Sequence, residues 1–225
     1  HIILAGDSVF DNHSYVKDGE PDVRDQLADL LDDGDRVTLV AEDGAINEDL
    51  SKQLDNIPKD ATHLFISTGG NDALMHIDSF SESVSTIGEA LDSLNERVEV
   101  FEKEYIKMLN NVSKYSLKTI LCTIYNPCFE HIELDRIIYM LPPNPNLEKL
   151  QKRAMIALSI FNNIIFLEAF NFGLPVMDLR LIFSDKEDYA NPIEPSVVGG
   201  MKMANIMKDI SDNHDFSMKS SIVYK

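Results

Sequence analysis

The sequence predicts an α/β domain built on a parallel β-sheet that helices cover on both faces. Short runs of β-branched and aliphatic residues alternate with longer amphipathic segments along the 225 residues. Such continuously apolar runs are typical of parallel strands that are buried on both faces. Because strands and helices alternate, right-handed crossovers should place the strands side by side in one sheet. We therefore expect a layered α/β/α architecture with five parallel strands.

Each predicted element follows from its local pattern. Strands are expected at 1–5, 36–41, 63–68, 119–125 and 174–179, and helices at 22–31, 47–54, 94–113, 147–172 and 196–210. The helix at 147–172 has the clearest limits, because a proline-rich stretch precedes it and Gly173 and Pro175 follow it. The segments 77–93 and 126–146 break the alternation after strand ends. We expect them to form a rim or lid over the carboxyl edge of the sheet.

Length and hydropathy favour one domain without a membrane anchor. Residues 1–225 are expected to fold as a single unit, with a tail at 211–225 that either adds an edge strand or is mobile. No apolar run approaches the roughly 20 residues of a membrane helix, so no integral membrane segment is expected. The chain opens on a strand without a basic and apolar leader, which slightly favours the cytoplasm. A leader removed earlier would leave the same start, so the compartment stays open.

Charge and cysteine content narrow the choice of partners. With 20 basic and 38 acidic residues, the formal net charge is −18. Such a chain repels nucleic-acid phosphates and anionic bilayers, so neither is an expected partner. The chain has two cysteines, Cys122 and Cys128. Their number and positions do not suit a disulfide scaffold or a zinc site, so we interpret them as ordinary thiols. The oligomeric state stays undecided.

Small and polar residues occur in four stretches at the predicted carboxyl ends of strands. They occupy 6–8, 42–45, 67–72 and 191–196. Because the carboxyl ends of parallel strands meet at one edge of a sheet, these four stretches should converge there. A serine at that edge lies beside a helix start, where free N–H groups can stabilise a developing anion. Ser8 is therefore a candidate nucleophile.

The order of these stretches resembles that of the SGNH, or GDSL-type, hydrolase family. Gly6-Asp7-Ser8 is similar to the family's nucleophile block, and Asn12 matches its downstream asparagine. Residues 69–72, Gly-Gly-Asn-Asp, are similar to its Gly-x-Asn-Asp block. The resemblance spans most of the chain. It implies a flavodoxin-like three-layer fold and the hydrolysis of acyl or acetyl esters without a metal or other cofactor.

The same resemblance implies roles for three residues. Ser8 would be the nucleophile, and its N–H, the N–H of Gly44 and the side-chain amide of Asn71 would form the oxyanion hole. These residue types suit that task, because glycine permits close backbone approach and an asparagine amide supplies a directed donor. Taken alone, Gly44 is equally well explained as a turn glycine. For Asn71, a role as a turn or helix-cap residue is the less favoured interpretation, given its neighbours.

The last block departs from the family's pattern, which has Asp-x-x-His with histidine as the general base. This chain has Asn191 in the position of the aspartate and Glu194 in the position of the histidine. Glu194 would serve as the base if burial raised its pKa above the usual value of about 4.3. Asp188 is a conceivable displaced orienting group, although a solvated surface acid is the plainer interpretation.

Two alternatives to Glu194 as the base stay open. A histidine from another segment could be the base, and His131, His76 and His13 all follow predicted strand ends. Alternatively the site binds without turnover, as a pseudoenzyme that holds an acyl or carbohydrate ligand. A flavin-binding protein is a weaker alternative, because no phosphate-cradling loop follows the first strand. The leading hypothesis is a serine esterase or acylhydrolase that acts on a small-molecule ester, with the substrate itself unspecified.

Overall fold

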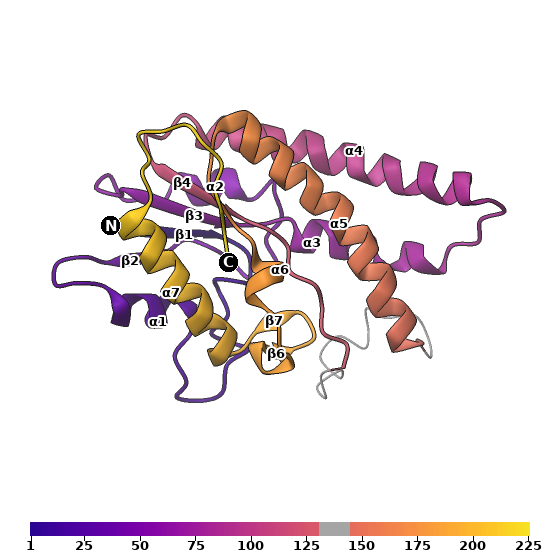
Figure 1. Cartoon of the computed structure of the whole chain (residues 1–225), viewed down its shortest axis with the longest axis horizontal. Helices are drawn as coiled ribbons and strands as arrows, with labels where there is room; N and C mark the ends of the chain where they lie inside the picture. Colours follow the sequence, from indigo (N-terminus) through magenta and orange to yellow (C-terminus); the bar gives the residue numbers. More distant parts are fainter. Residues whose placement is uncertain (131–144) are drawn as a thin grey trace.

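A parallel sheet of six strands forms the centre of the protein (Figure 1). The computed structural model describes residues 1–130 and 145–225, apart from the side chains of Asp78 and Ser81. The strands are β1 (Ile2–Gly6), β2 (Val37–Leu39), β3 (His63–Ser67), β4 (Lys118–Cys122), β5 (Val176–Met177) and β8 (Val223–Tyr224). Their spatial order is β2-β1-β3-β4-β5-β8, and each neighbouring pair is parallel. The order of the first five strands is the flavodoxin-like one.

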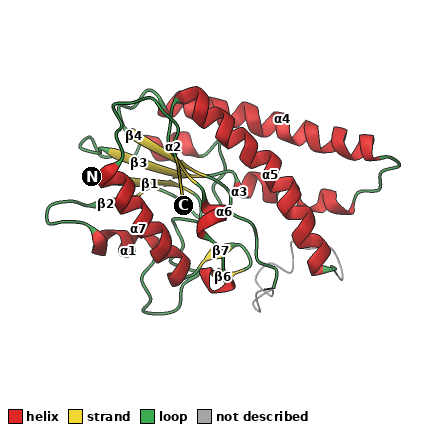
Figure 2. Cartoon of the chain, viewed as in Figure 1, coloured by secondary structure: helices red, strands yellow, loops and turns green. Residues whose placement is uncertain are grey.

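Helices cover both faces of this sheet (Figure 2). One face is covered by α1 (Val23–Leu30) and α7 (Val197–Asn213), and the other by α2 (Leu50–Leu54), α4 (Ile87–Val112) and α5 (Leu147–Phe172). Shorter elements lie at the carboxyl edge. They are α3 (Gly70–Leu74), the 3-10 helices η1 (Ile77–Ser81) and η4 (Lys186–Asp188), α6 (Leu179–Ile182), and the antiparallel pair β6 (Tyr189–Asn191) and β7 (Glu194–Pro195). The predicted three-layer class is confirmed.

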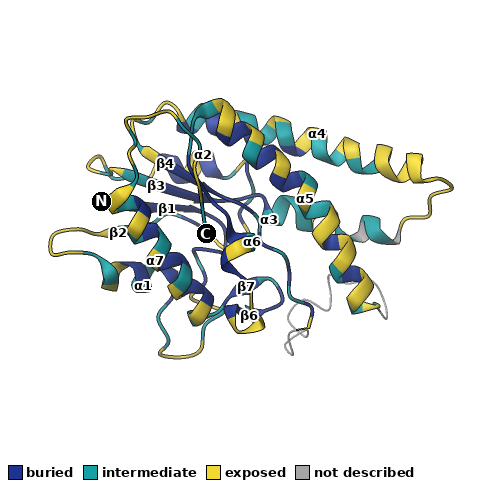
Figure 3. Cartoon of the chain, viewed as in Figure 1, coloured by how far each residue is buried: buried dark blue, intermediate teal, exposed yellow. Residues whose placement is uncertain are grey.

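Strand β1 shows how the two faces share the core. Ile2 and Leu4 belong to the apolar cluster beneath α1 and α7, whereas Ile3 and Ala5 belong to the cluster beneath α2, α4 and α5. This alternation is the two-residue period of a strand. All four side chains are buried, which explains why the strand is apolar at every position (Figure 3). Polar side chains appear only where the strand ends.

Two details differ from the sequence-based expectation. The sheet has six strands rather than five, because residues near the end of the chain add β8 beside β5. Helix α4 begins at Ile87 rather than at residue 94, because Thr86 caps it by accepting a hydrogen bond from the N–H of Glu89. The expected rim at 77–93 is therefore η1 followed by the first turns of α4. Most of the expected rim at 126–146 lies outside the described residues.

Helix α5 combines core packing with an unusually apolar sequence. By length and composition it is the one helix in the described ranges that could cross a bilayer. Its side chains Phe161, Ile164 and Ile165 are buried in the core beside the sheet. Asn162 fixes its position by accepting from the N–H of Ile124 and donating to the carbonyl oxygen of Ile124, both at 2.8 Å. Helix α5 is thus tied to the segment that leaves β4.

Candidate active site

The turn after β1 presents Ser8 at the carboxyl edge of the sheet. Gly6 has φ +129°, and a Cβ built on it would lie 1.7 Å from the carbonyl oxygen of Ser67, so only glycine fits between β1 and β3. Gln53 of α2 clamps this glycine: its Oε1 accepts from the Gly6 N–H at 2.7 Å and its Nε2 donates to the Gly6 carbonyl at 2.8 Å. The backbone immediately before Ser8 is therefore held from two sides.

The hydroxyl of Ser8 is hydrogen-bonded to a carboxyl group from the other end of the chain. Ser8 Oγ donates to Glu194 Oε1 at 3.1 Å. Both residues are buried. A serine and a proton acceptor within hydrogen-bond distance form the minimal unit of an activated nucleophile. The structure therefore brings together the predicted nucleophile and the predicted base.

A short hairpin holds Glu194 in this position. Asn191 Oδ1 accepts from the N–H of Ile193 at 2.9 Å and so shapes the turn between β6 and β7. The hydroxyl of Tyr125 donates to the carbonyl oxygen of Ile193. On the other side, Asn12 Nδ2 donates to the carbonyl oxygen of Pro195 at 3.3 Å. Contacts to the residues on either side of Glu194 thus fix its backbone.

Burial changes the acid–base properties of Glu194. Desolvation is the largest influence and raises its pKa well above the ordinary 4.5, and the negative charges of Asp7 and Asp43 raise it further. The hydrogen bond from Ser8 acts in the opposite direction and lowers the pKa. Within the described part of the chain, Glu194 Oε2 is buried and has no hydrogen-bond partner. A carboxylate in such a position binds a proton more readily than an exposed one does.

A second buried carboxyl group lies next to the nucleophile. Burial raises the pKa of Asp7 from 3.8 to about 7, the hydrogen bond from the Val9 N–H lowers it, and the charge of Asp72 raises it. Asp7 Oδ1 accepts from the Val9 N–H at 3.2 Å and from Ser67 Oγ at 3.4 Å. The site therefore contains two carboxyl groups whose charged forms disfavour each other.

Asn71 also lies at this edge, at the start of α3. Its Nδ2 donates to the carbonyl oxygen of Ala45 at 2.9 Å. This bond connects Asn71 to the turn that contains Gly44, which has φ +82°. Asn71 and Ser8 both line a cavity at the carboxyl edge of the sheet, whereas Gly44 is absent from its wall.

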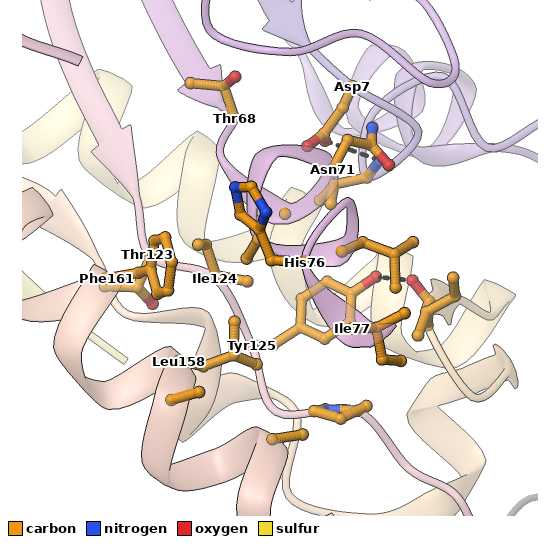
Figure 4. Close-up of a pocket in the computed structure, with 18 of the residues that line it drawn as sticks. Asp7, Thr68, Asn71, His76, Ile77, Thr123, Ile124, Tyr125, Leu158 and Phe161 are labelled. Carbon is orange, nitrogen blue, oxygen red and sulfur yellow. Dashed lines mark hydrogen bonds between the residues drawn. The ribbon is translucent and has the colours of Figure 1, made fainter. Parts of the chain in front are cut away.

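This cavity has a volume of about 130 Å³ and opens beside Ser8. Figure 4 shows Asp7 and Asn71 on one side of it and Leu158 and Phe161 of α5 on the other. Apart from its polar end at Ser8, the wall is mostly apolar. It includes side chains from α3, η1, α4, α5 and the segment after β4. An apolar cavity with a few convergent polar groups is typical of a small-molecule site.

The three candidate histidines have different positions. His76 lines the cavity (Figure 4). The ring of His13 is mostly exposed, and its Nδ1 lies 3.5 Å from Asp22 Oδ2. His131 lies outside the described residues. Glu194, by comparison, accepts a hydrogen bond from the hydroxyl of Ser8 at 3.1 Å.

Asp188 is neither a solvated acid nor directed at Glu194. It is fully buried, and its carboxylate accepts from the N–H groups of Ser184 and Asp185 and from Lys202 Nζ at 2.8 Å. The plainer interpretation of Asp188 as a surface acid is thus wrong. Its charge is matched by Lys202, and it organises the loop that enters β6.

Sequence reasoning misses three residues that shape the site. In the sequence, Asp7 is only a part of the nucleophile block, and Gln53 resembles an ordinary helical residue. Tyr125 falls at the end of an apolar run and gives no sign that its hydroxyl reaches Ile193. Each acts through a contact far away in the sequence, so no local pattern could reveal it. Among the residues described, no cluster of three His, Cys, Asp or Glu side chains suited to a metal ion occurs.

Comparison with solved structures identifies the fold. No protein-family model and no curated protein matches the sequence. An extracellular lipase from Streptomyces rimosus superposes with a TM-score of 0.63 at 14% identity, covering 92% of this chain and 98% of that one. A phospholipase A1 from Streptomyces albidoflavus gives 0.63 at 15% identity, with the same coverage. A GDSL-like lipase from Bacteroides thetaiotaomicron gives 0.58 at 11% identity, covering 94% of this chain and 87% of that one.

The chain therefore has the fold of the GDSL-type, or SGNH, hydrolases. The resemblance inferred from the sequence is confirmed at this level. At these sequence identities the likeness establishes the architecture, and the chemistry must be argued from the residues themselves.

Proposed function

We propose that this protein hydrolyses carboxylic esters through an acyl-enzyme intermediate on Ser8, with Glu194 as the general base. The observation that carries the proposal is the 3.1 Å hydrogen bond from Ser8 Oγ to Glu194 Oε1 at the polar end of an apolar cavity. The fold agrees with it, because solved proteins of this fold include enzymes named lipase, esterase and phospholipase.

The reaction would use one proton acceptor twice. As Ser8 Oγ attacks the ester carbonyl carbon, its proton passes to Glu194, and the collapse of the tetrahedral intermediate returns that proton to the departing alcohol. Water then attacks the acyl-enzyme, gives a proton to Glu194 and releases the acid, and Ser8 recovers its proton. Glu194 must be ionised at the start, so the raised pKa makes it a stronger base but delays its ionisation to higher pH.

The oxyanion would be stabilised by N–H donors around Ser8. A primary amide has two N–H groups, and Asn71 uses one on the carbonyl of Ala45. The second would donate to the substrate oxygen, together with the backbone N–H of Ser8. The N–H of Gly44 stays part of the proposal as a third donor. Since Gly44 does not line the cavity, its contribution requires a shift of its turn when the ester binds.

The lining of the cavity favours an acyl group over a sugar. A carbohydrate requires several hydrogen-bonding side chains, whereas the wall beyond Ser8 is largely aliphatic and aromatic. We therefore place the acyl chain of the ester against α5 and η1, and the alcohol on the solvent side. The alternative, a binding protein without turnover, draws its support from the buried Glu194, which in its protonated form could not accept the proton of Ser8.

Labelling with a short-chain fluorophosphonate separates the two functions. An enzyme of this kind should be labelled once per chain at Ser8, with a rate that increases with pH, and Ser8→Ala should remove the label. Ser113→Ala, which changes an exposed serine at the end of α4, should leave labelling unchanged. The labelling should be measured between about pH 6 and 9, because a general base works best when its pKa lies near the operating pH. If protein that is folded by circular dichroism takes up no label in this range, the result would support the binding protein.

A further inference from the structure

Helix α4 has an apolar stripe of which only part is covered. Ile87, Leu91, Leu94, Val98, Phe101 and Tyr105 follow one another at intervals of three or four residues, so they lie along one side of the helix. Phe101 and Tyr105 are buried, Leu94 and Val98 are partly buried, and Leu91 and Ile87 are 57% and 81% exposed. Figure 3 shows the same gradient, with the start of α4 projecting as an exposed end.

We call the exposed part of this stripe, Ile87 and Leu91, the outer stripe. It continues the wall of the cavity, because Leu94, one turn further along the same side of α4, lines that cavity. From Leu94 to Ile87 the helix rises about 10 Å at about 1.5 Å per residue. The outer stripe thus begins one turn from a residue that lines the proposed acyl site.

The charges around the outer stripe indicate what it can contact. Glu89, Asp92 and Glu96 lie on the opposite side of the helix, so this end of α4 is amphipathic and acidic. The nearby Arg97 is neutralised, because its guanidinium donates to Glu82 Oε1 at 2.8 Å and to Ser93. An anionic surface would be repelled, also by the net charge of −18. A surface without net charge would not be repelled, and its contacts would be with the apolar side chains of the outer stripe.

We propose that the outer stripe docks the protein on a zwitterionic lipid surface, with Ile87 and Leu91 inserted between the lipid molecules. Large apolar side chains at a projecting helix end are suited to shallow and reversible insertion. The position also has a use, since the outer stripe begins one turn from Leu94 in the wall of the cavity that Ser8 lines. Docking of this kind is separate from ester hydrolysis, and it can be measured without turnover.

The chain has no tryptophan, so the fluorescence of a single introduced tryptophan reports on the surroundings of that one position. In the full chain with Ser8→Ala, which prevents lipid cleavage, Ile87→Trp should show a blue shift of its emission when phosphatidylcholine vesicles are added. The matched control is Phe170→Trp on the last turn of α5. Phe170 is also exposed, at 62%, but that turn lies beside the C-terminal part of α4, far from the start of α4 (Figure 1). No shift is expected there.

Substitution of the outer stripe gives the second measurement. In the Ser8→Ala background, Ile87→Asp with Leu91→Asp should reduce the partition coefficient onto these vesicles by at least about tenfold, since burial of each side chain supplies the attraction. Phe170→Asp should leave the partition coefficient unchanged. Vesicles with added phosphatidylserine should bind the protein less tightly.

Three results would overturn the proposal. The first is an unshifted emission at Ile87→Trp, and the second is an equal shift at both tryptophan positions. The third is tighter binding to phosphatidylserine vesicles. Sedimentation equilibrium tests the alternative that the outer stripe joins two copies of the chain. In that case the double Asp variant will have half the mass of the parent protein, and vesicle binding will be absent. Because Ser8→Ala is inactive by design, these results are independent of whether the protein is an esterase.

Discussion

The hydroxyl of Ser8 donates a hydrogen bond to a carboxyl oxygen of Glu194, and the carboxyl group of Asp7 lies beside the same nucleophile. A glutamate therefore occupies the place next to the serine that a general base requires. Its burial has two opposing effects, because desolvation strengthens it as a proton acceptor and also keeps it protonated to higher pH. In the proposed mechanism, the balance between these effects determines the pH range in which the site is active, and each effect can be tested.

Replacement of Glu194 tests its role as the base. Glu194→Gln preserves the shape but cannot accept a proton, so kcat for a short-chain ester should fall by about 10²–10⁴. Glu194→His should restore part of this activity, with a rising pH limb near the ordinary histidine pKa of about 6.5. Steady-state kinetics over pH measures both, with exposed Glu187→Gln as the control. Full activity in Glu194→Gln would assign the base to another residue, with His76 the first candidate.

The pH profile should report the mutual influence of the two carboxyl groups. In the native protein kcat/KM should increase with pH as Glu194 loses its proton, with a midpoint well above 4.5. Asp7→Asn removes a negative charge that raises the pKa of Glu194, so the midpoint should move to lower pH. The asparagine Oδ1 can still accept from the Val9 N–H. An unmoved midpoint would show that Asp7 and Glu194 do not interact.

Asp7 should also make folding stability depend on pH. Its pKa is raised from 3.8 to about 7, so between these values the folded protein holds a proton that the unfolded chain has released. The stabilising contribution is thus complete below about pH 4 and is lost as pH rises through about 7. At about 1.4 kcal/mol per pKa unit, the loss reaches up to about 4 kcal/mol. Urea unfolding measures this effect. The free energy of unfolding of Asp7→Asn, relative to that of the native protein, should increase as pH rises. The same pH dependence of this free energy in both proteins would contradict the prediction.

Removal of the side-chain amide tests the oxyanion hole. Asn71→Ala should lower kcat by about 10²–10³ and change KM little, because the proposed donor acts mainly on the transition state. Asn205→Ala changes an exposed amide on α7 and should have no effect on either constant. A large increase in KM with an unchanged kcat would show that Asn71 binds substrate without stabilising the oxyanion.

The depth of the cavity should set the length of the acyl chain. Ala157 of α5 lines the cavity, whereas its neighbour Ile156 is 67% exposed. Ala157→Phe should therefore retain hydrolysis of acetyl and butyryl esters and lose most hydrolysis of octanoyl esters, while Ile156→Phe should retain both. The ratio of kcat/KM values for the two chain lengths measures the effect. An identical ratio in Ala157→Phe and in the parent protein would place the acyl group elsewhere.

Much of the fold could be predicted because its signals are local. The runs at β1, β3 and β4 are apolar at successive positions, and α5 has a proline-rich stretch before it and Gly173 after it. The predicted limits of α5 agree with the structure. Strand β8 has only two residues and becomes a strand through its pairing with β5. The early start of α4 depends on the Thr86 cap, and the apolar side chains that follow it remain uncovered, which is untypical of a core helix.

The site was less predictable than the fold, because its decisive contacts join distant segments. The sequence placed Ser8, Asn71 and Glu194 at strand ends, and the structure arranges them around one cavity. It could not indicate that Gln53 holds Gly6 or that Tyr125 holds the carbonyl of Ile193. These contacts depend on the order of strands in space. The same holds for Asp188, whose partner Lys202 comes from the next helix.

The proposed nucleophile Ser8 and its proposed proton acceptor Glu194 are separated by 186 positions along the chain. Neither half of the polypeptide contains both, so a fragment or a partly assembled intermediate has no competent catalytic pair. During refolding, ester cleavage should recover only with the last docking event that joins the two ends, later than the return of helical content. The return of enzymatic activity would then report when the β6–β7 hairpin has docked beside the turn after β1.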